Sequence, residues 1–265
     1  MQKNPKIDKG NAFDWGQASL DYAKYRDIYP EEFYLKIIEL GLCTSGQRVL
    51  DLGTGTGVLP RNLYRFGAKW TGVDISENQI NQARRLSEEE QMDISFFAAP
   101  AEQTGLEDNQ FDVVTACQCF FYFDPQKVIP EIVRVLRPGG RLLILFMAWL
   151  PYESEIAGKS EELVLKYNPD WTGAGMKRKE SAVPEWAQGQ FTCRHVMDYA
   201  VDIPFTRESW HGRMLACRGT GASSLPKETI EAFRREHSGY MLTVPERFVI
   251  PHFVNLLDLE VIKKS

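Results

Sequence analysis

Short apolar runs alternate with amphipathic segments along the first half of the chain. Runs rich in Val, Ile, Leu and Phe are typical of buried strands, whereas apolar residues that recur every three or four positions indicate helices. Five strands are predicted, at 48–52, 70–73, 94–98, 111–117 and 141–147. Helices are predicted between them at 58–66, 76–90 and 125–136. Strands that alternate with helices in this way indicate a parallel sheet with helices on both faces.

The segments on either side of this alternation follow other patterns. Residues 1–12 are polar and are expected to fray, 13–29 have loose helical spacing that ends at Pro30, and 31–40 form an amphipathic helix with Gly41 as its C-cap. After residue 150 the chain is richer in loops. The predicted elements there are helices at 155–167, 208–217 and 227–237, the last capped near Ser224, and strands at 191–205 and 248–262, the last interrupted by Pro251.

A glycine-rich turn follows the first predicted strand. The sequence reads Asp51-Leu52-Gly53-Thr54-Gly55-Thr56-Gly57, and the second strand ends in Gly72-Val73-Asp74. Glycines turn tightly and let a ligand approach the backbone, and the N-terminus of the next helix offers free N–H groups. A carboxylate at the end of the second strand can hold a ribose diol. The pattern predicts a nucleotide-type site at the carboxyl ends of the strands.

The spacing of the glycines distinguishes between nucleotides. A dinucleotide fingerprint, G-x-G-x-x-G, requires glycine at position 58, where this chain has Val58. Asp51 stands just before the loop, where a pyrophosphate would be unfavourable. A ligand that carries an amino group and a sulfonium suits that carboxylate better. The motif therefore favours a cationic nucleoside over a dinucleotide.

Composition narrows the classes of partner. The chain has 265 residues, a formal net charge of −5 and a sequence pI of about 5.5, which argue against binding along a nucleic-acid backbone. The five cysteines show neither C-x-x-C nor zinc-ligand spacing, and no apolar run is long enough for a membrane span. We expect a cytoplasmic protein, a monomer or homodimer, with no metal, nucleic acid or membrane as partner.

Four motifs in order resemble one family. They are the glycine loop, Asp74, the run Phe111-Asp112-Val113-Val114, and the turn Leu136-Arg137-Pro138-Gly139-Gly140. Their order over residues 45–150 resembles class I S-adenosylmethionine-dependent methyltransferases of the methyltransferase type 11 family. The earlier stretch from Tyr22 to Pro30 is similar to the Y-x-x-Y-R-x-x-Y-P element of trans-aconitate-methyltransferase-like enzymes.

This resemblance implies an α/β, Rossmann-like fold with a seven-stranded, mostly parallel sheet, helices on both faces and a small helical cap. It implies three regions: an N-terminal lid over the cofactor at 1–45, the S-adenosylmethionine-binding core at 46–150, and cap helices of the acceptor site with the last two strands at 151–265. The implied activity is methyl transfer from S-adenosyl-L-methionine, with S-adenosyl-L-homocysteine as product, to a small carboxylate or phenol-like molecule through O, N or S.

The resemblance also implies which residues bind the cofactor. Asp51 and the backbone of the glycine loop would hold the amino-acid part, Asp74 the ribose, and Ile75 the adenine. The expected set is Tyr22, Arg26, Asp51, Gly53, Thr54, Gly55, Asp74, Ile75, Ala101, Glu102, Cys117 and Gln118. Many relatives have Gly-Asp-Ala where this chain has Ala99-Pro100-Ala101, so the backbone N–H of Ala101 or Glu102 would have to replace an Asp side chain.

The acceptor site is less defined. Phe121 stands where trans-aconitate-methyltransferase-like sequences often have a histidine, so no histidine base is available there. The candidate catalytic residues are Tyr122, His211 and Arg213; Glu102, His195 and His237 are further candidate bases, and Arg218 is a further candidate partner for an acceptor carboxylate. Two other classes stay open: a non-catalytic module that binds the cofactor, and a nicotinamide-dinucleotide dehydrogenase.

Overall fold

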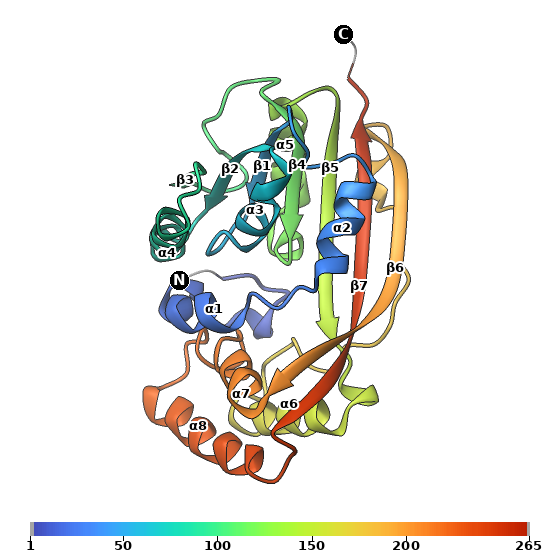
Figure 1. Ribbon diagram of the computed structural model, residues 1–265. Coiled ribbons are helices and arrows are strands. Elements are labelled where there is room, and N and C mark those ends of the chain that lie inside the picture. Colours follow the sequence, from blue (N-terminus) through green and yellow to red (C-terminus); the bar gives the residue numbers. More distant parts are fainter. Residues whose placement is uncertain (1–2, 264–265) are drawn as a thin grey trace. The chain divides into compact units, whose positions relative to one another are not determined.

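Seven strands form a single sheet in the computed structural model, which describes residues 3–263 (Figure 1). The strand order is β3-β2-β1-β4-β5-β7-β6. The strands are β1 (Arg48–Leu52), β2 (Lys69–Asp74), β3 (Ser95–Ala98), β4 (Phe111–Cys117), β5 (Leu136–Trp149), β6 (Phe191–Thr206) and β7 (Arg247–Val261). The pairs β1–β2, β1–β4, β2–β3 and β4–β5 are parallel, and β7 runs opposite to its neighbours in Figure 1. The predicted α/β, Rossmann-like, mostly parallel sheet is confirmed.

The helices agree with the hydrophobic periodicity at most positions. They are α1 (Ser19–Tyr25), α2 (Glu31–Glu39), α3 (Val58–Leu63), α4 (Glu77–Glu89), α5 (Pro125–Val135), α6 (Glu155–Tyr167), α7 (Arg207–Leu215) and α8 (Lys227–Met241). The Ser76 hydroxyl caps α4 by accepting from the N–H of Gln79. Asp124 caps α5 in the same way, and Pro125 begins that helix with its φ already suited to it.

Three expectations about local structure are wrong. Helix α8 begins after Pro226, which has no capping side chain, and not at Ser224. Pro251 lies inside a continuous β7, because the fixed φ of proline fits an extended backbone and its carbonyl accepts from Leu150 N–H at 2.9 Å. Fraying was predicted for residues 1–12; residues 1–2 lie outside the described part, but Asp8 is buried and ordered by contacts described below.

The chain forms two compact units. The one called here the sheet unit contains the described residues 29–147, 180–199 and 254–263. The other, called here the helical unit, contains 3–28, 148–179 and 200–253. The regions predicted at 1–45, 46–150 and 151–265 stay predictions.

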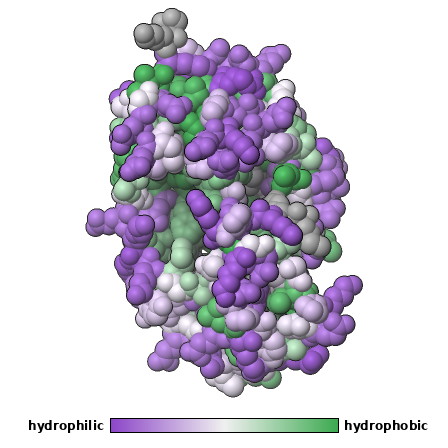
Figure 2. Space-filling view, turned by 180° about the vertical axis from the view of Figure 1, so that it is seen from behind, coloured by the Kyte–Doolittle hydropathy of each residue, from purple (hydrophilic) through white to green (hydrophobic). Residues whose placement is uncertain are grey.

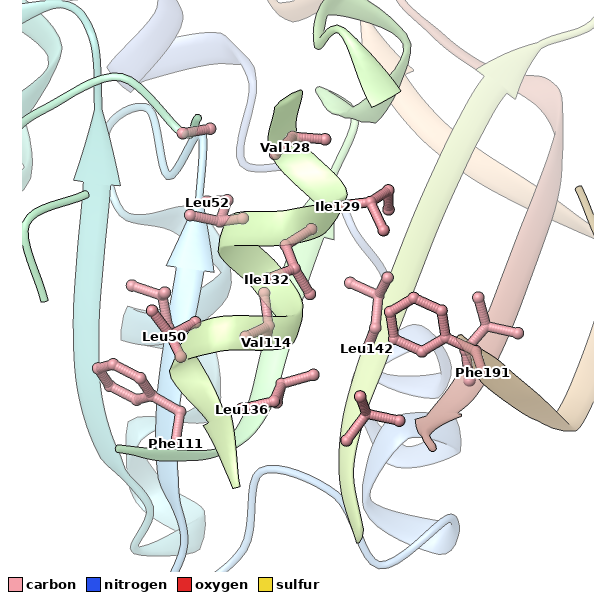
Figure 3. Close-up of a cluster of buried hydrophobic side chains, with 14 of the residues drawn as sticks. Leu50, Leu52, Phe111, Val114, Val128, Ile129, Ile132, Leu136, Leu142 and Phe191 are labelled. Carbon is pink, nitrogen blue, oxygen red and sulfur yellow. The ribbon is translucent and has the colours of Figure 1, made fainter. Parts of the chain in front are cut away.

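The core of the sheet unit lies between α5 and the central strands. Figure 3 shows Val128, Ile129 and Ile132 of α5 in one buried cluster with Leu50 and Val114 of the central strands. These residues are at most 2% exposed. Burial of one such side chain contributes about 1.5–3 kcal/mol, so this cluster fixes α5 on the strands whose ends carry the glycine loop. The core thereby positions the candidate site.

Hydrophilic side chains cover much of the face drawn in Figure 2, with hydrophobic areas between them. Among residues 3–263, no helix combines the length and the apolar character needed to cross a membrane.

Candidate functional site

The loop between β1 and α3 has a backbone that only glycine adopts at low cost. Gly53, Gly55 and Gly57 have φ values of 61°, 57° and 74°. Side chains other than that of glycine are disfavoured in this left-handed region. The loop is held by hydrogen bonds from Thr54 N–H to the carbonyl of Val73 and from Gly57 N–H to that of Thr54, each at 2.9 Å.

Two of these glycines are also required by close packing inside the protein. A Cβ on Gly53 would lie 2.8 Å from the Cβ and Sγ of Cys119. A Cβ on Gly57 would lie 2.8 Å from the ring of Phe96. From the sequence, the glycines were expected to let a ligand approach the backbone. At positions 53 and 57 the atoms that occupy this space belong to the protein itself.

Asp74 joins the end of β2 to the loop. Its carboxylate accepts from the backbone N–H of Gly55 at 3.0 Å and from that of Ser76 at 2.9 Å. Burial raises the pKa of Asp74, while these two N–H groups act in the opposite direction. Ile75, the next residue, is 57% exposed. A carboxylate and an exposed apolar side chain therefore stand together beside the loop.

Asp51 lies at the point where the order of the strands reverses. It is 2% exposed and pairs in register with Thr115 on β4, whose hydroxyl donates to the carboxylate at 2.6 Å. Burial raises the pKa of Asp51 to about 7, and the negative charge of Asp74 acts in the same direction. Ligands of open parallel sheets bind at this switch point. A cation there would stabilise the charged form of Asp51.

The ends of β3 and β4 carry the remaining predicted contacts in the sheet unit. Ala101 is buried and Glu102 partly exposed in a turn that closes with a 3.1 Å hydrogen bond from Gln103 N–H to the carbonyl of Pro100. Gln118 has a φ of 65°, rare for a residue with a side chain. Its N–H donates to the carbonyl of Leu145 at 2.8 Å, and its amide to that of Met147 at 2.5 Å.

Cys117 ends β4, and the aromatic residues Phe121 and Tyr122 follow a few positions later. The thiol of Cys117 donates to the hydroxyl of Tyr29 at 3.6 Å. Tyr122 ends a short helical turn, and its ring centroid is 4.2 Å from that of Phe121, which is 48% exposed and also contacts Phe146. The residue that replaces the expected histidine thus belongs to a partly exposed aromatic cluster.

Tyr22 and Arg26 belong to the helical unit. The guanidinium of Arg26 lies 4.7 Å from the ring centroid of Tyr22 and 5.6 Å from that of Trp15. This cation–π arrangement brings the two predicted residues together. Their contact with a methionine carboxylate stays a prediction.

The two candidate arginines differ. Arg218 forms a buried ion pair with Asp8, with its Nε 2.7 Å from the carboxylate. That pairing neutralises its charge inside the helical unit. Arg213 is 5% exposed and lies over the ring of Trp149 at 4.8 Å. Arg213 is therefore retained as a candidate for the acceptor site and Arg218 is not.

The histidines lie in separate environments. His195, in the sheet unit, has its Nδ1 2.7 Å from the carboxylate of Asp258, which also binds Arg141. His211 and His237, in the helical unit, contact each other through their Nδ1 atoms at 2.7 Å. Burial lowers the pKa of His211, and lowers that of His237 to about 3. Within residues 3–263, no three His, Cys, Asp or Glu side chains form a metal-binding group.

Sequence reasoning missed Thr115, Cys119 and Ser160. Thr115 lies near the end of a predicted strand, so placing that strand beside the first one would have brought it opposite Asp51. Cys119 had no predicted role, because its contact with Gly53 depends on how the chain turns back after β4. Ser160 on α6 lies within hydrogen-bond distance of His237 on α8 because the two helices pack together, and no sequence pattern predicts that packing.

The segment that carries the glycine loop is similar to known methyltransferases. Residues 50–144 match the model of a methyltransferase domain. An uncharacterized methyltransferase of Mycobacterium bovis is 32% identical over 159 residues, which are 58% of this chain and 62% of the relative. A ubiquinone biosynthesis O-methyltransferase of Coxiella burnetii is 35% identical over 109 residues, 41% of this chain and 47% of the relative. The chain thus covers less than two thirds of the length of these curated relatives.

The fold has a counterpart among solved structures. A S-adenosylmethionine-dependent methyltransferase of Aquifex aeolicus is 14% identical, with a TM-score of 0.52 over 95% of this chain and 100% of that chain. At this identity the likeness concerns the fold alone. Residues 50–144 therefore match the methyltransferase domain model, and the sheet that contains them has the fold of this solved methyltransferase.

Proposed function

We propose that the chain transfers a methyl group from S-adenosyl-L-methionine to a small-molecule acceptor. One observation carries the proposal: the carboxylate of Asp74, at the end of β2, is hydrogen bonded to Gly55 of a glycine loop that lies within the matched domain. This arrangement connects a group that binds a ribose diol with a loop that can lie against the rest of a nucleoside ligand.

The residues present fit this cofactor. Asp51 is a buried carboxylate whose pKa of about 7 leaves it close to ionisation, so an ammonium or sulfonium nearby would favour its charged form. Ile75 offers an exposed apolar surface for an adenine ring. Ala101 and Glu102 would offer backbone N–H groups at the end of β3. When bound, the cofactor supplies an electrophilic methyl group, and the protein mainly positions the two reactants.

Further residues have proposed supporting roles. Tyr22 and Arg26 would bind the methionine carboxylate, since a guanidinium donates charge-assisted hydrogen bonds to such a group. Thr54, Cys117 and Gln118 would line the cofactor, and the left-handed backbone of Gln118 costs about 1–2 kcal/mol that its two hydrogen bonds to β5 offset.

The acceptor is proposed to be a small phenol or carboxylate. The net charge of −5 disfavours a nucleic-acid substrate. The relative named as a ubiquinone biosynthesis O-methyltransferase supports oxygen as the methylated atom, over the 109 residues that it shares with this chain.

Calorimetry with S-adenosylhomocysteine and with NAD tests the cofactor. We expect S-adenosylhomocysteine to bind and NAD not to bind; the reverse would indicate a dehydrogenase and overturn the proposal. Transfer of a labelled methyl group is then measured with catechol, benzoate, aniline and thiophenol. S-adenosylhomocysteine binding without turnover over a broad extension of this panel would indicate a non-catalytic binding module.

A further inference from the structure

Two hydroxyl groups of the sheet unit act on the buried carboxylate of Asp51. The hydroxyl of Thr115 on β4, itself fully buried, lies 2.6 Å from Oδ1 of Asp51. On the other side of β1, Asp51 pairs in register with Gly72. The hydroxyl of Thr54 in the glycine loop lies 2.8 Å from the position of a Cβ on Gly72. Both hydroxyls favour the ionised form of Asp51.

The hydrogen bond from Thr115 is strongest when Asp51 is ionised. A hydroxyl has one proton and an ionised carboxylate can only accept, so Thr115 donates to Asp51. The carbonyl of Leu50, at 3.4 Å, is a longer alternative for the same proton. The separation of 2.6 Å is typical of a charge-assisted O–H···O⁻ bond, which is about twice as strong as a neutral one. Loss of the charge on Asp51 therefore weakens this bond.

No cation of the described chain balances the charge of Asp51. Over residues 3–263, no Lys, Arg or His side chain forms an ion pair with it. The titratable groups that face it are Asp74, whose negative charge opposes its ionisation, and the thiols of Cys43 and Cys119. Burial holds the pKa of both thiols well above its usual value, so both are neutral. Because a buried, ionised carboxylate without a counter-ion is costly, the balancing cation is expected from a bound ligand.

We propose that Thr115 is a positioning residue for the methyl donor, because it holds Asp51 in the ionised form that binds the ammonium group of the donor. This inference rests on the proposed function, and it adds the ligand group recognised at Asp51 and the residue that prepares Asp51 for it. Thr115 acts through Asp51. The consequence is that uptake of a proton by Asp51 removes the form of the site that binds the cofactor.

The pKa of Asp51 sets the pH range of this effect. Burial raises that pKa to about 7, so the ionised form is lost as pH falls below this value. The ionised fraction is about a half at pH 7 and about a tenth at pH 6, and apparent affinity scales with the fraction of competent protein. Binding should therefore weaken about fivefold between these two pH values and level off above about pH 8.

Calorimetry of the whole protein with S-adenosylhomocysteine and with 5′-methylthioadenosine tests the ligand group. The two probes share a nucleoside and a thioether, but only S-adenosylhomocysteine carries the amino-acid part with its ammonium. We expect the affinity for S-adenosylhomocysteine to fall about fivefold from pH 7 to pH 6, and that for 5′-methylthioadenosine to stay constant. A flat profile for S-adenosylhomocysteine, or an equal fall for both probes, would overturn the inference.

Thr115→Val separates positioning from a structural role. Valine keeps the branched shape but cannot donate, so ionisation of Asp51 should become about tenfold less favourable. Affinity for S-adenosylhomocysteine should then be about tenfold below that of the unaltered protein at pH 6 and within about twofold of it at pH 8.5. Thr115→Ser should keep the unaltered profile, and Thr71→Val, on β2 opposite Leu50, is the matched control. An equal loss at all pH values would refute the positioning role.

Carbon NMR of the protein with labelled aspartate follows the same proton without a ligand. The signal of the Asp51 carboxyl, assigned by its loss in Asp51→Asn, should titrate at a higher pH in Thr115→Val than in the unaltered protein. Titration at the same pH in both would overturn the inference even if Thr115→Val bound neither probe. Failure of the unaltered protein to bind S-adenosylhomocysteine at any pH would instead refute the proposed function.

Discussion

The side chain of Cys119 fills the space that a side chain on Gly53 would need. Both its Cβ and its Sγ lie 2.8 Å from the position of a Cβ on Gly53, and its thiol donates to the carbonyl of Leu52 at 3.0 Å. The turn after β4 thereby braces the first glycine of the loop after β1. The position of the loop depends on this contact as well as on the φ of Gly53.

Gly53→Ala should lower the free energy of unfolding by more than the cost of the left-handed backbone alone. The left-handed backbone costs about 1–2 kcal/mol for any other residue, and the clash with Cys119 adds about 1–3 kcal/mol. Gly105→Ala is the matched control, since Gly105 has a φ of +74° but no atom within 4 Å of its added Cβ. Urea unfolding should show the larger loss for Gly53→Ala, with weaker binding of S-adenosylhomocysteine; equal losses would contradict the role of Cys119.

Asp74→Asn should weaken cofactor binding by about tenfold or more. Both oxygens of Asp74 accept from backbone N–H groups, and an amide can present only one oxygen, so its NH₂ would face an N–H. One buried bond lost without replacement costs about 1–3 kcal/mol. Calorimetry with S-adenosylhomocysteine measures the change, and Asp93→Asn, at an exposed aspartate, is the control. Unchanged affinity in Asp74→Asn would exclude Asp74 from the site.

Asp51→Asn should stabilise the protein above pH 7 while weakening the binding of the cationic cofactor. Burial holds the pKa of Asp51 at about 7 in the folded chain, against 3.8 when unfolded. Between these values the folded state binds the extra proton, so stability falls as pH rises. We expect Asp51→Asn to gain on the order of 2 kcal/mol at pH 8 and little at pH 4.

Urea unfolding of the unaltered protein and Asp51→Asn at both pH values measures this gain. Asn keeps an oxygen that can accept from Thr115, so the contact across β1 and β4 is retained. A variant that is less stable at pH 8 would show that the charge of Asp51 stabilises the fold.

Much of the sheet unit could be predicted from local patterns. Strands β1 to β5 follow from short apolar runs. The placement of Asp51, Gly55 and Asp74 at one edge follows because parallel strands bring their carboxyl ends together. The packing of Cys119 against Gly53 could not be predicted, since it depends on how the turn after β4 folds back.

The helical unit shows why the rest escaped prediction. Arg218 was interpreted as a partner for an acceptor carboxylate, but Asp8, 210 positions earlier in the chain, supplies that charge. His211, His237 and Ser160 come together because α6, α7 and α8 pack against one another, and no pattern in the sequence indicates this packing. Long-range pairs of polar side chains are fixed by tertiary packing and not by local periodicity.

Stability should fall on acidification because of His237. The pKa of His237 is about 3 in the folded chain, well below the ordinary value of 6.5. Between these pH values the unfolded chain therefore binds a proton at this residue and the folded chain does not. Each pH unit below 6.5 should cost on the order of 1 kcal/mol from this group. His252, with a pKa of about 4, adds a similar loss, whereas Asp51 acts in the opposite direction.

A comparison of variants isolates the contribution of His237 from these opposing groups. The slope of unfolding free energy against pH between 6 and 4 should be smaller in His237→Gln than in the unaltered protein by about 1 kcal/mol per pH unit, since the amide does not titrate. Gln can still donate to Ser160, which limits the loss of stability at pH 7. Urea unfolding across this range measures the slopes. Equal slopes in the two proteins would mean that His237 is protonated in the folded chain, so that neither its burial nor its contact with His211 prevents protonation.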